Sequence, residues 1–266
     1  MRTRLLGNVI GKEWRYTFTK ASYLVFVLVI PLILTGQSFW SVYAFVLDED
    51  SDEDVPPVPL ELLADDAAAA ELSPLGRLAV FVFLQVPLFL LLIPVMVANT
   101  LATYSIIEEK QTGTLEPLLA TPVSTRELLF GKTLSGAIPA VLIYWFCSGV
   151  LFLLFALIGP AYVTAFMLEP IWLVCWLLVG PLASILAYLL GIIASSRASD
   201  AKSAQALALV IILPLLGLIA LQVFGIVLFD LVNLLILSVV LAAATWLVLR
   251  LAERVFARER ILVRWK

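Results

Sequence analysis

Two short stretches of this chain contain residue types that could hold a ligand, and the first would hold a phosphate. The tripeptide Gly-Lys-Thr at 131–133 resembles the end of a P-loop, in which backbone N–H groups and a lysine surround phosphate groups. The full motif requires a glycine five residues before Gly131, and that position is Arg126. No strand pattern precedes it either. The sequence therefore predicts no nucleotide-binding site in this chain.

The second stretch is acidic and would hold a calcium ion. Asp50, Asp52, Asp54 and Glu61 stand at the first, third, fifth and twelfth positions of an EF-hand loop. The sixth position must be glycine for the sharp turn, but here it is Val55, followed by two prolines. We therefore interpret this stretch as a solvated anionic loop and predict no metal site.

Side chains that could perform catalysis are scarce. Histidine is absent, which removes the usual general base and the Ser-His and Cys-His nucleophile pairs. Cys147 and Cys175 lie inside long apolar runs without metal-ligand spacing, so we interpret both as packing residues. We expect a protein that is not an enzyme and binds no cofactor of its own.

The elements that position these residues are expected to be membrane helices. Hydrophobic residues make up 62% of the 266 residues, mean hydropathy is +1.07, and charged residues are 14%, against about 25% in soluble domains. Crossing the hydrocarbon core takes about 20 apolar residues. The charge-free stretches predict an all-α integral membrane domain, 1–266, with six spans at 22–46, 78–106, 133–158, 170–194, 205–228 and 231–250.

The distribution of charge predicts the orientation. All but one of the 17 basic residues fall on one side of the predicted spans, and the exception is Arg77. Because basic residues accumulate on the cytosolic side, both termini are expected in the cytosol of a multi-pass protein of the cell membrane. Residues 1–20 are predicted to form an interfacial amphipathic helix, since Leu6, Ile10, Trp14 and Phe18 recur every four residues. Residues 251–266 are expected to form a basic cytosolic tail, and residues 47–77 an acidic extracellular loop.

Two features within the spans predict how the helices pack. Small residues recur every four positions along the fourth span, which lets another helix approach closely, within the bundle or between subunits: Ala183, Ala187, Gly191 and Ser195. Prolines are expected to kink their helices at Pro31, Pro87, Pro94, Pro139, Pro181 and Pro214. No Asp, Glu, Lys or Arg lies within a span except Arg250 at the end of the sixth, which argues against a proton-driven carrier.

The segment 107–132 between spans 2 and 3 carries most of the functional information. Gly113 allows a break after span 2, and a short piece with three leucines follows until Pro122. Ser124 and Glu127 then fit a capping box that starts the helix of span 3. The predicted path is a helix, a turn, a short helix on the membrane face, and a second turn into a helix. The exposed leucines need a cover, either lipid headgroups or a cytosolic protein.

This segment resembles the signature of ABC-2 type permeases, the membrane subunits of one class of ABC exporters. The matching positions are Glu108, Glu109, Lys110, Gly113, Thr114, Leu115, Glu116, Leu118, Leu119, Pro122, Ser124, Glu127, Leu128, Gly131 and Lys132. The resemblance implies that 107–132 contains a cytosolic coupling helix that docks on a separate ATPase subunit. It also implies re-entrant helices between spans 5 and 6, for which 223–233 is the available stretch.

The resemblance further implies a working unit of two permeases and two ATPases, with ATP and Mg²⁺ bound by the ATPases alone. The permease would be a homodimer or would pair with a close paralogue. The docking residues it implies are Glu108, Glu109, Gly113, Thr114, Leu115, Glu116, Leu118, Leu119, Pro122 and Glu127. The residues themselves leave two alternatives open, a membrane scaffold that recruits a cytosolic partner and a secondary carrier.

Overall fold

A computed structural model describes residues 11 and 14 and the ranges 25–47, 73–113, 125–159, 161–198, 201–225 and 230–255. Within them every regular element is a helix, as the all-α prediction requires. Several predictions fall outside these residues: most of the interfacial helix at 1–20, the acidic loop after residue 47, the middle of the coupling segment at 114–124, and the basic tail beyond residue 255.

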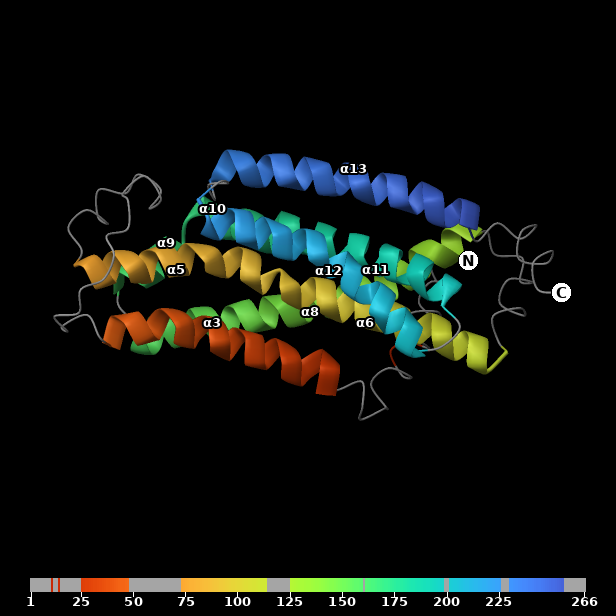
Figure 1. The fold of residues 1–266 in the computed structure, drawn as a ribbon, viewed down its shortest axis with the longest axis horizontal. Helices are drawn as coiled ribbons and strands as arrows, with labels where there is room; N and C mark the ends of the chain where they lie inside the picture. The colour runs from red at the N-terminus through yellow and green to blue at the C-terminus, as the bar shows by residue number, and fades with distance from the viewer. Residues whose placement is uncertain are drawn as a thin grey trace.

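The helices form one elongated bundle in which consecutive long helices run in opposite directions (Figure 1). Helices α5 and α6 follow one another in the same direction, as do α10, η3 and α11. In chain order the elements are η1 (Val25–Val29), α3 (Ile30–Leu47), α5 (Pro74–Leu90), α6 (Leu92–Gln111), α8 (Thr125–Ile158), α9 (Ala161–Met167), α10 (Pro170–Val174), η3 (Cys175–Val179), α11 (Gly180–Arg197), α12 (Ala201–Val223) and α13 (Leu231–Val255).

Among the described residues, five helical stretches are long and apolar enough to cross a membrane. They are Val27–Phe45, Pro74–Glu109, Leu129–Ile158, Pro170–Ser196 and Leu231–Arg254. The sequence predicts a sixth span at 205–228. The helix there, α12, has a shorter apolar part within the described residues, Val210–Val223.

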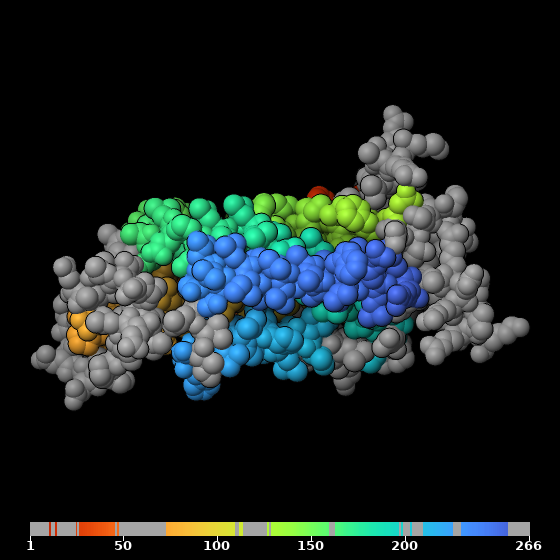
Figure 2. All heavy atoms as spheres, turned by 90° about the horizontal axis from the view of Figure 1, so that it is seen from above, coloured from red at the N-terminus to blue at the C-terminus, as the bar shows by residue number. Residues whose placement is uncertain are grey.

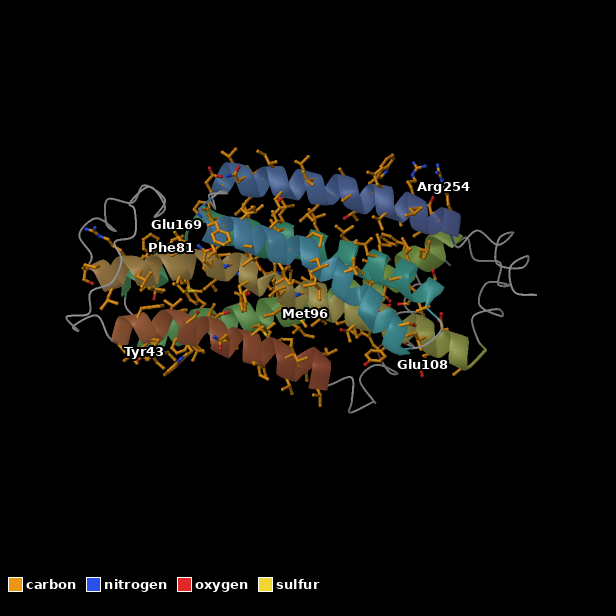
Figure 3. The ribbon with its side chains drawn as sticks, viewed as in Figure 1. Tyr43, Phe81, Met96, Glu108, Glu169 and Arg254 are labelled. Carbon is orange, nitrogen blue, oxygen red and sulfur yellow. The ribbon has the colours of Figure 1, made fainter. Side chains whose placement is uncertain are left out.

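Labelled charged side chains lie towards the two ends of the bundle. Glu169 lies near one end, and Glu108 and Arg254 lie at the other (Figure 3). Between them the outer surface is apolar, and α13 is the clearest case, since it runs along one face with most of its side chains exposed (Figure 2). An apolar exterior with charges at the ends is the arrangement that a lipid bilayer requires.

Prolines lie beside distorted turns at some positions and inside continuous helices at others. Two π-helical turns, η1 and η3, come just before Pro31 and Pro181. A proline ring clashes with the carbonyl four residues earlier, and a wider turn relieves that clash. The second predicted span is broken at Leu91, between Pro87 and Pro94, into α5 and α6. In contrast, α8 and α12 continue through Pro139 and Pro214.

Helix α11 lies at the centre of the bundle and packs against α6, α8, α12 and α13. The small residues Ala183, Ala187 and Ser195 are buried there. A Cβ added to Gly191 would lie 2.7 Å from Asn99 Oδ1 and 2.8 Å from Ala102 Cβ of α6. The small-residue ridge is therefore buried inside this chain, where it lets α6 approach closely.

The contact between α8 and α11 is made by two tyrosines that lie over two glycines. The ring of Tyr188 of α11 covers Gly136 of α8, and the ring of Tyr144 of α8 covers Gly180 of α11. Both rings are almost completely buried. Between these contacts, Ser184 Oγ donates a hydrogen bond of 3.2 Å to the Ala137 carbonyl. These contacts fix the antiparallel register of α8 and α11.

Replacing Gly136 by alanine is expected to destabilise the bundle, because a Cβ there would lie 1.9 Å from Tyr188 Cε2. Overpacking a buried contact costs about 1–3 kcal/mol. The matched control is Gly149→Ala in the same helix, where a Cβ has no atom within 4 Å. Equilibrium unfolding in mixed detergent and SDS micelles measures both variants. Equal stability of the two would contradict the packing described here.

An aromatic cluster joins α3, α5, α8 and α10 in the half of the bundle where α8 ends. Phe83 of α5 stacks on Trp172 of α10 with ring centroids 5.1 Å apart, and meets the edge of Phe155 of α8 at 5.7 Å. Phe39 of α3 contacts the same Phe155 at 5.0 Å. A hydrogen bond between helices lies in the same half of the bundle. Gln222 Nε2 of α12 donates it to the Leu84 carbonyl of α5 at 2.9 Å.

Candidate functional site: the junction of α6 and α8

The first side of the site is the end of α6, which comes just before the middle of the predicted coupling segment at 114–124. The last turn is closed by Thr112, whose backbone N–H and Oγ1 each donate 2.8 Å hydrogen bonds to the Glu108 carbonyl. Gly113 follows with φ of 66°, the left-handed conformation that glycine adopts most easily after a helix. Gly113 is exposed. The end of α6 is therefore defined by the Thr112 hydrogen bonds and the left-handed Gly113.

The second side is the start of α8, at which the segment returns. The helix begins at Thr125 and has Glu127 in its first turn, where a carboxylate is favoured by the positive end of the helix dipole. Leu129 is buried in the core, whereas Phe130 is 52% exposed. This first turn and a half therefore already has an inward face and an outward face.

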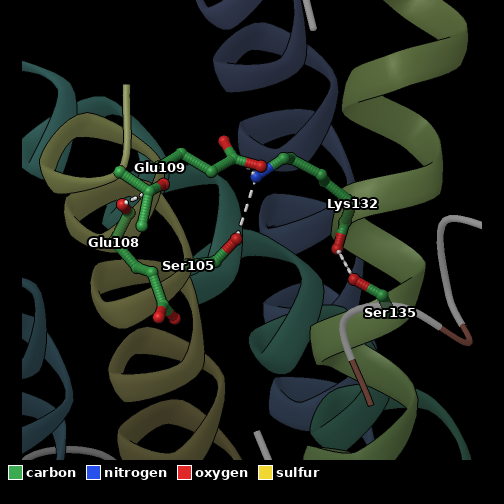
Figure 4. A network of polar contacts seen from close by, with 6 residues as sticks. Ser105, Glu108, Glu109, Lys132 and Ser135 are labelled. Carbon is green, nitrogen blue, oxygen red and sulfur yellow. Dashed lines mark hydrogen bonds and ion pairs between the residues drawn. The ribbon is translucent and has the colours of Figure 1, made fainter. Parts of the chain in front are cut away.

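A buried ion pair joins the two helices. Lys132 Nζ of α8 lies 2.7 Å from Glu109 Oε2 of α6, and it donates a 2.9 Å hydrogen bond to Ser105 Oγ of α6 (Figure 4). Ser105 and Glu109 are four residues apart, so they share one face of α6 and both reach the same ammonium group. Glu109 is 6% exposed and Lys132 is 3% exposed. The side chain of Glu108 points away from Lys132 (Figure 4).

Two further contacts connect the ion pair to its surroundings. Ser135 Oγ donates to the Lys132 carbonyl at 2.7 Å, and Trp14 Nε1 donates to the Ser135 carbonyl at 2.8 Å. Trp14 comes from the N-terminal segment, so that segment reaches the base of α8. The α6–α8 junction, as we name it, consists of Ser105, Glu109, Lys132 and Ser135, and Trp14 contacts it from outside.

The structure places four of the predicted docking residues. Glu108 is partly buried at the end of α6, Glu109 is paired inside the junction, Gly113 is exposed, and Glu127 lies at the start of α8. The remaining predicted docking residues lie outside the described part of the chain: Thr114, Leu115, Glu116, Leu118, Leu119 and Pro122. The four described residues thus lie on both sides of residues 114–124, at one end of the bundle.

The ion pair is the feature that sequence reasoning did not identify. Glu109 and Lys132 border predicted spans 2 and 3 on the same side, and their charges are opposite. That combination was the available signal. Charged residues beside a span usually face water, however, and nothing in the sequence shows how each helix is rotated.

The contacts of the junction are of a kind that holds two helices together. Within the described ranges no group of three or more His, Cys, Asp or Glu side chains is placed to hold a metal ion. Ammonium, carboxylate and hydroxyl groups contact each other here. The junction can therefore hold α6 and α8 in register on both sides of residues 114–124, the middle of the predicted coupling segment.

Comparison with known proteins identifies one family. The model of the family described as ABC-2 family transporter protein matches residues 7–249. That range includes the α6–α8 junction and all of the helices up to the last turns of α13. No curated protein matches the chain. No solved structure matches it either.

Proposed function

Because the chain belongs to the ABC-2 transporter family, we propose that it is the permease subunit of an ATP-driven exporter that works with a separate ATPase. The single observation that carries this proposal is the family match over residues 7–249. The α6–α8 junction supports it, because a segment that transmits force needs firmly held ends. Such a permease binds no nucleotide itself, and ATP and Mg²⁺ belong to the ATPase.

We place the ATPase contact on the segment between the two helix ends. The residues proposed to meet the ATPase are Glu108, Gly113, Thr114, Leu115, Glu116, Leu118, Leu119, Pro122 and Glu127. Glu109 is removed from this set, because its carboxylate is buried against Lys132 and leaves little surface for a partner. A coupling helix over part of 114–122 belongs to the same proposal.

The same proposal includes six spans, with α12 (Ala201–Val223) as the fifth. The base of α8 that Trp14 contacts, the end of α6 and the end of α13 at Val255 lie at one end of the bundle (Figure 1). The positive-inside rule assigns that end to the cytosol, because most basic residues of the chain belong to segments at this end. The working unit is a pair of permeases, identical or paralogous, with two ATPases in the cell membrane.

Two measurements on the wild-type framework test the proposal. A Thr112→Cys variant should react with a membrane-impermeant maleimide in inside-out vesicles and not in right-side-out vesicles. The native cysteines, Cys147 and Cys175, are buried and give little background. The tagged chain purified from its own membranes in mild detergent should carry vanadate-sensitive, Mg²⁺-dependent ATP hydrolysis.

The two outcomes separate the possible functions. Labelling of Thr112→Cys from outside the cell would reverse the orientation and remove the ATPase contact. A chain that never carries ATP hydrolysis but moves solute along an ion gradient would be a secondary carrier. A chain that recruits a cytosolic protein without any transport would be a scaffold.

A further inference from the structure

A buried ion pair such as Glu109–Lys132 is expected to contribute little to the net stability of the fold. Removing two charges from water costs several kcal/mol for each ion, and their attraction repays this only with good geometry. Replacing such a pair by apolar side chains of similar volume is often neutral or stabilising. The pair therefore calls for a role other than net stability, and fixing the register between two elements is the best-attested one.

The position of the pair indicates which register is fixed. Glu109 lies in the last turn of α6, which ends at Gln111, and Lys132 lies in the second turn of α8, which begins at Thr125. The pair thus joins the two helices directly behind the points where the coupling segment is attached. A force on the segment therefore passes the pair before it reaches most of either helix.

The geometry of the pair sets how closely the register is fixed. Sliding one helix by a single residue changes an axial position by about 1.5 Å. A slide of that size breaks the 2.7 Å contact to Glu109 and the 2.9 Å bond to Ser105 unless Lys132 changes rotamer, and its burial leaves little room for that change. Burial keeps water from replacing the lost partners. One side of the pair, Lys132, is also connected through Ser135 to Trp14.

We propose that Glu109 and Lys132 are positioning residues that make the ends of α6 and α8 move as one body when the coupling segment is displaced. The source of the displacement rests on the proposed function, namely the ATPase that docks on the segment. The coupling of α6 to α8 itself does not, because it is a property of the permease alone.

The first experiment measures that coupling without any partner. Spin labels are attached at Thr112→Cys beyond α6 and at the exposed Phe130→Cys on α8, in the full chain in lipid nanodiscs. The chain with the native pair should give one narrow distance distribution. The apolar variant Glu109→Met/Lys132→Met should give a distribution broadened by about 1.5 Å or more, the rise of one residue.

Two variants separate charge from packing in this measurement. The exchanged pair Glu109→Lys/Lys132→Glu should restore the narrow distribution, since it keeps one charge of each sign. Thr133→Val is the matched control, because Thr133 Oγ1 bonds to the Leu129 carbonyl of its own helix and should leave the distribution narrow. A Met/Met variant as narrow as the native pair, or an exchanged pair as broad as Met/Met, would overturn the proposal.

The second experiment adds the ATPase and reads the far end of the bundle. Labels at Leu47→Cys and Leu168→Cys, both exposed, should show a distance change when ATP and vanadate trap the complex. The Met/Met variant should still trap nucleotide but lose most of that change. Retention of the full change would overturn the proposal. If no ATPase binds the wild-type chain, the proposed function fails while the first experiment still decides the role of the pair.

Discussion

Deleting Gly113–Ala120 is expected to abolish binding of the ATPase subunit, while the shortened chain still inserts into the membrane. The deleted residues contain Leu115, Leu118 and Leu119, which lie outside the predicted spans. Covering a leucine with a partner stabilises a complex by about 1.5–3 kcal/mol. The loss of three should weaken binding by about 4 kcal/mol or more, which is about a thousandfold. Co-purification and vanadate-sensitive ATP hydrolysis measure the effect.

The control for this deletion is an equally long one at the other end of the bundle. Removing Asp65–Leu72 shortens the acidic loop and should leave ATPase binding unchanged. A second variant keeps the length of the coupling segment and replaces its leucines by Leu115→Asp, Leu118→Asp and Leu119→Asp. It should lose the ATPase as the deletion does. If ATPase binding survived in both, the docking surface would have to lie elsewhere.

Replacing Lys132 alone by methionine is expected to cost more stability than replacing both members of its ion pair. The single change leaves the Glu109 carboxylate buried without its cation, and breaking a buried pair costs about 3–5 kcal/mol. Glu109→Met/Lys132→Met leaves no buried charge and should lie within about 1 kcal/mol of the native chain or above it.

A double-mutant cycle quantifies this prediction. Equilibrium unfolding in mixed detergent and SDS micelles is measured for the native chain, both single variants and the double variant. The summed losses of unfolding free energy in the two single variants should exceed the loss in the double variant by several kcal/mol. Each single variant leaves one buried charge without its partner, whereas the double variant leaves none. Ser105→Ala is a further comparison, expected to cost about 1 kcal/mol for one lost hydrogen bond. Additive losses would show that Glu109 and Lys132 have no net interaction and would contradict the prediction.

The helices of this bundle could be predicted because their signal is local. Long apolar stretches bounded by charges make up most of α3, α5 to α6, α8, and α10 to α11, and the pair Gly159-Pro160 predicts the end of α8 at Ile158. The break at Leu91 was less visible, since hydropathy continues through it and the two prolines nearby allow several positions for the kink. Pro139 lies inside α8 without ending it, so a proline alone does not tell where a helix is interrupted.

The candidate site could be predicted only in part, because its contacts depend on tertiary structure. The signature at 108–132 locates the segment, but Glu109 and Lys132 look like ordinary solvated residues beside a span. Their pairing depends on the rotation of two helices that the sequence does not specify. The glycines at 136 and 180 show the same limit. In the sequence each is a small residue in an apolar run, and only the structure shows that a tyrosine from another helix lies over it.

The reciprocal glycine–tyrosine contacts between α8 and α11 have a consequence for any cycle of the permease. A buried ring in a recess on each helix opposes both rolling and translation of one cylinder against the other. α8 and α11 are therefore expected to travel together, as a rigid rod pair, through every state of the transport cycle. Opening and closing of a pathway must then take place at their borders, against α3, α12 or α13, or at the break in the second span.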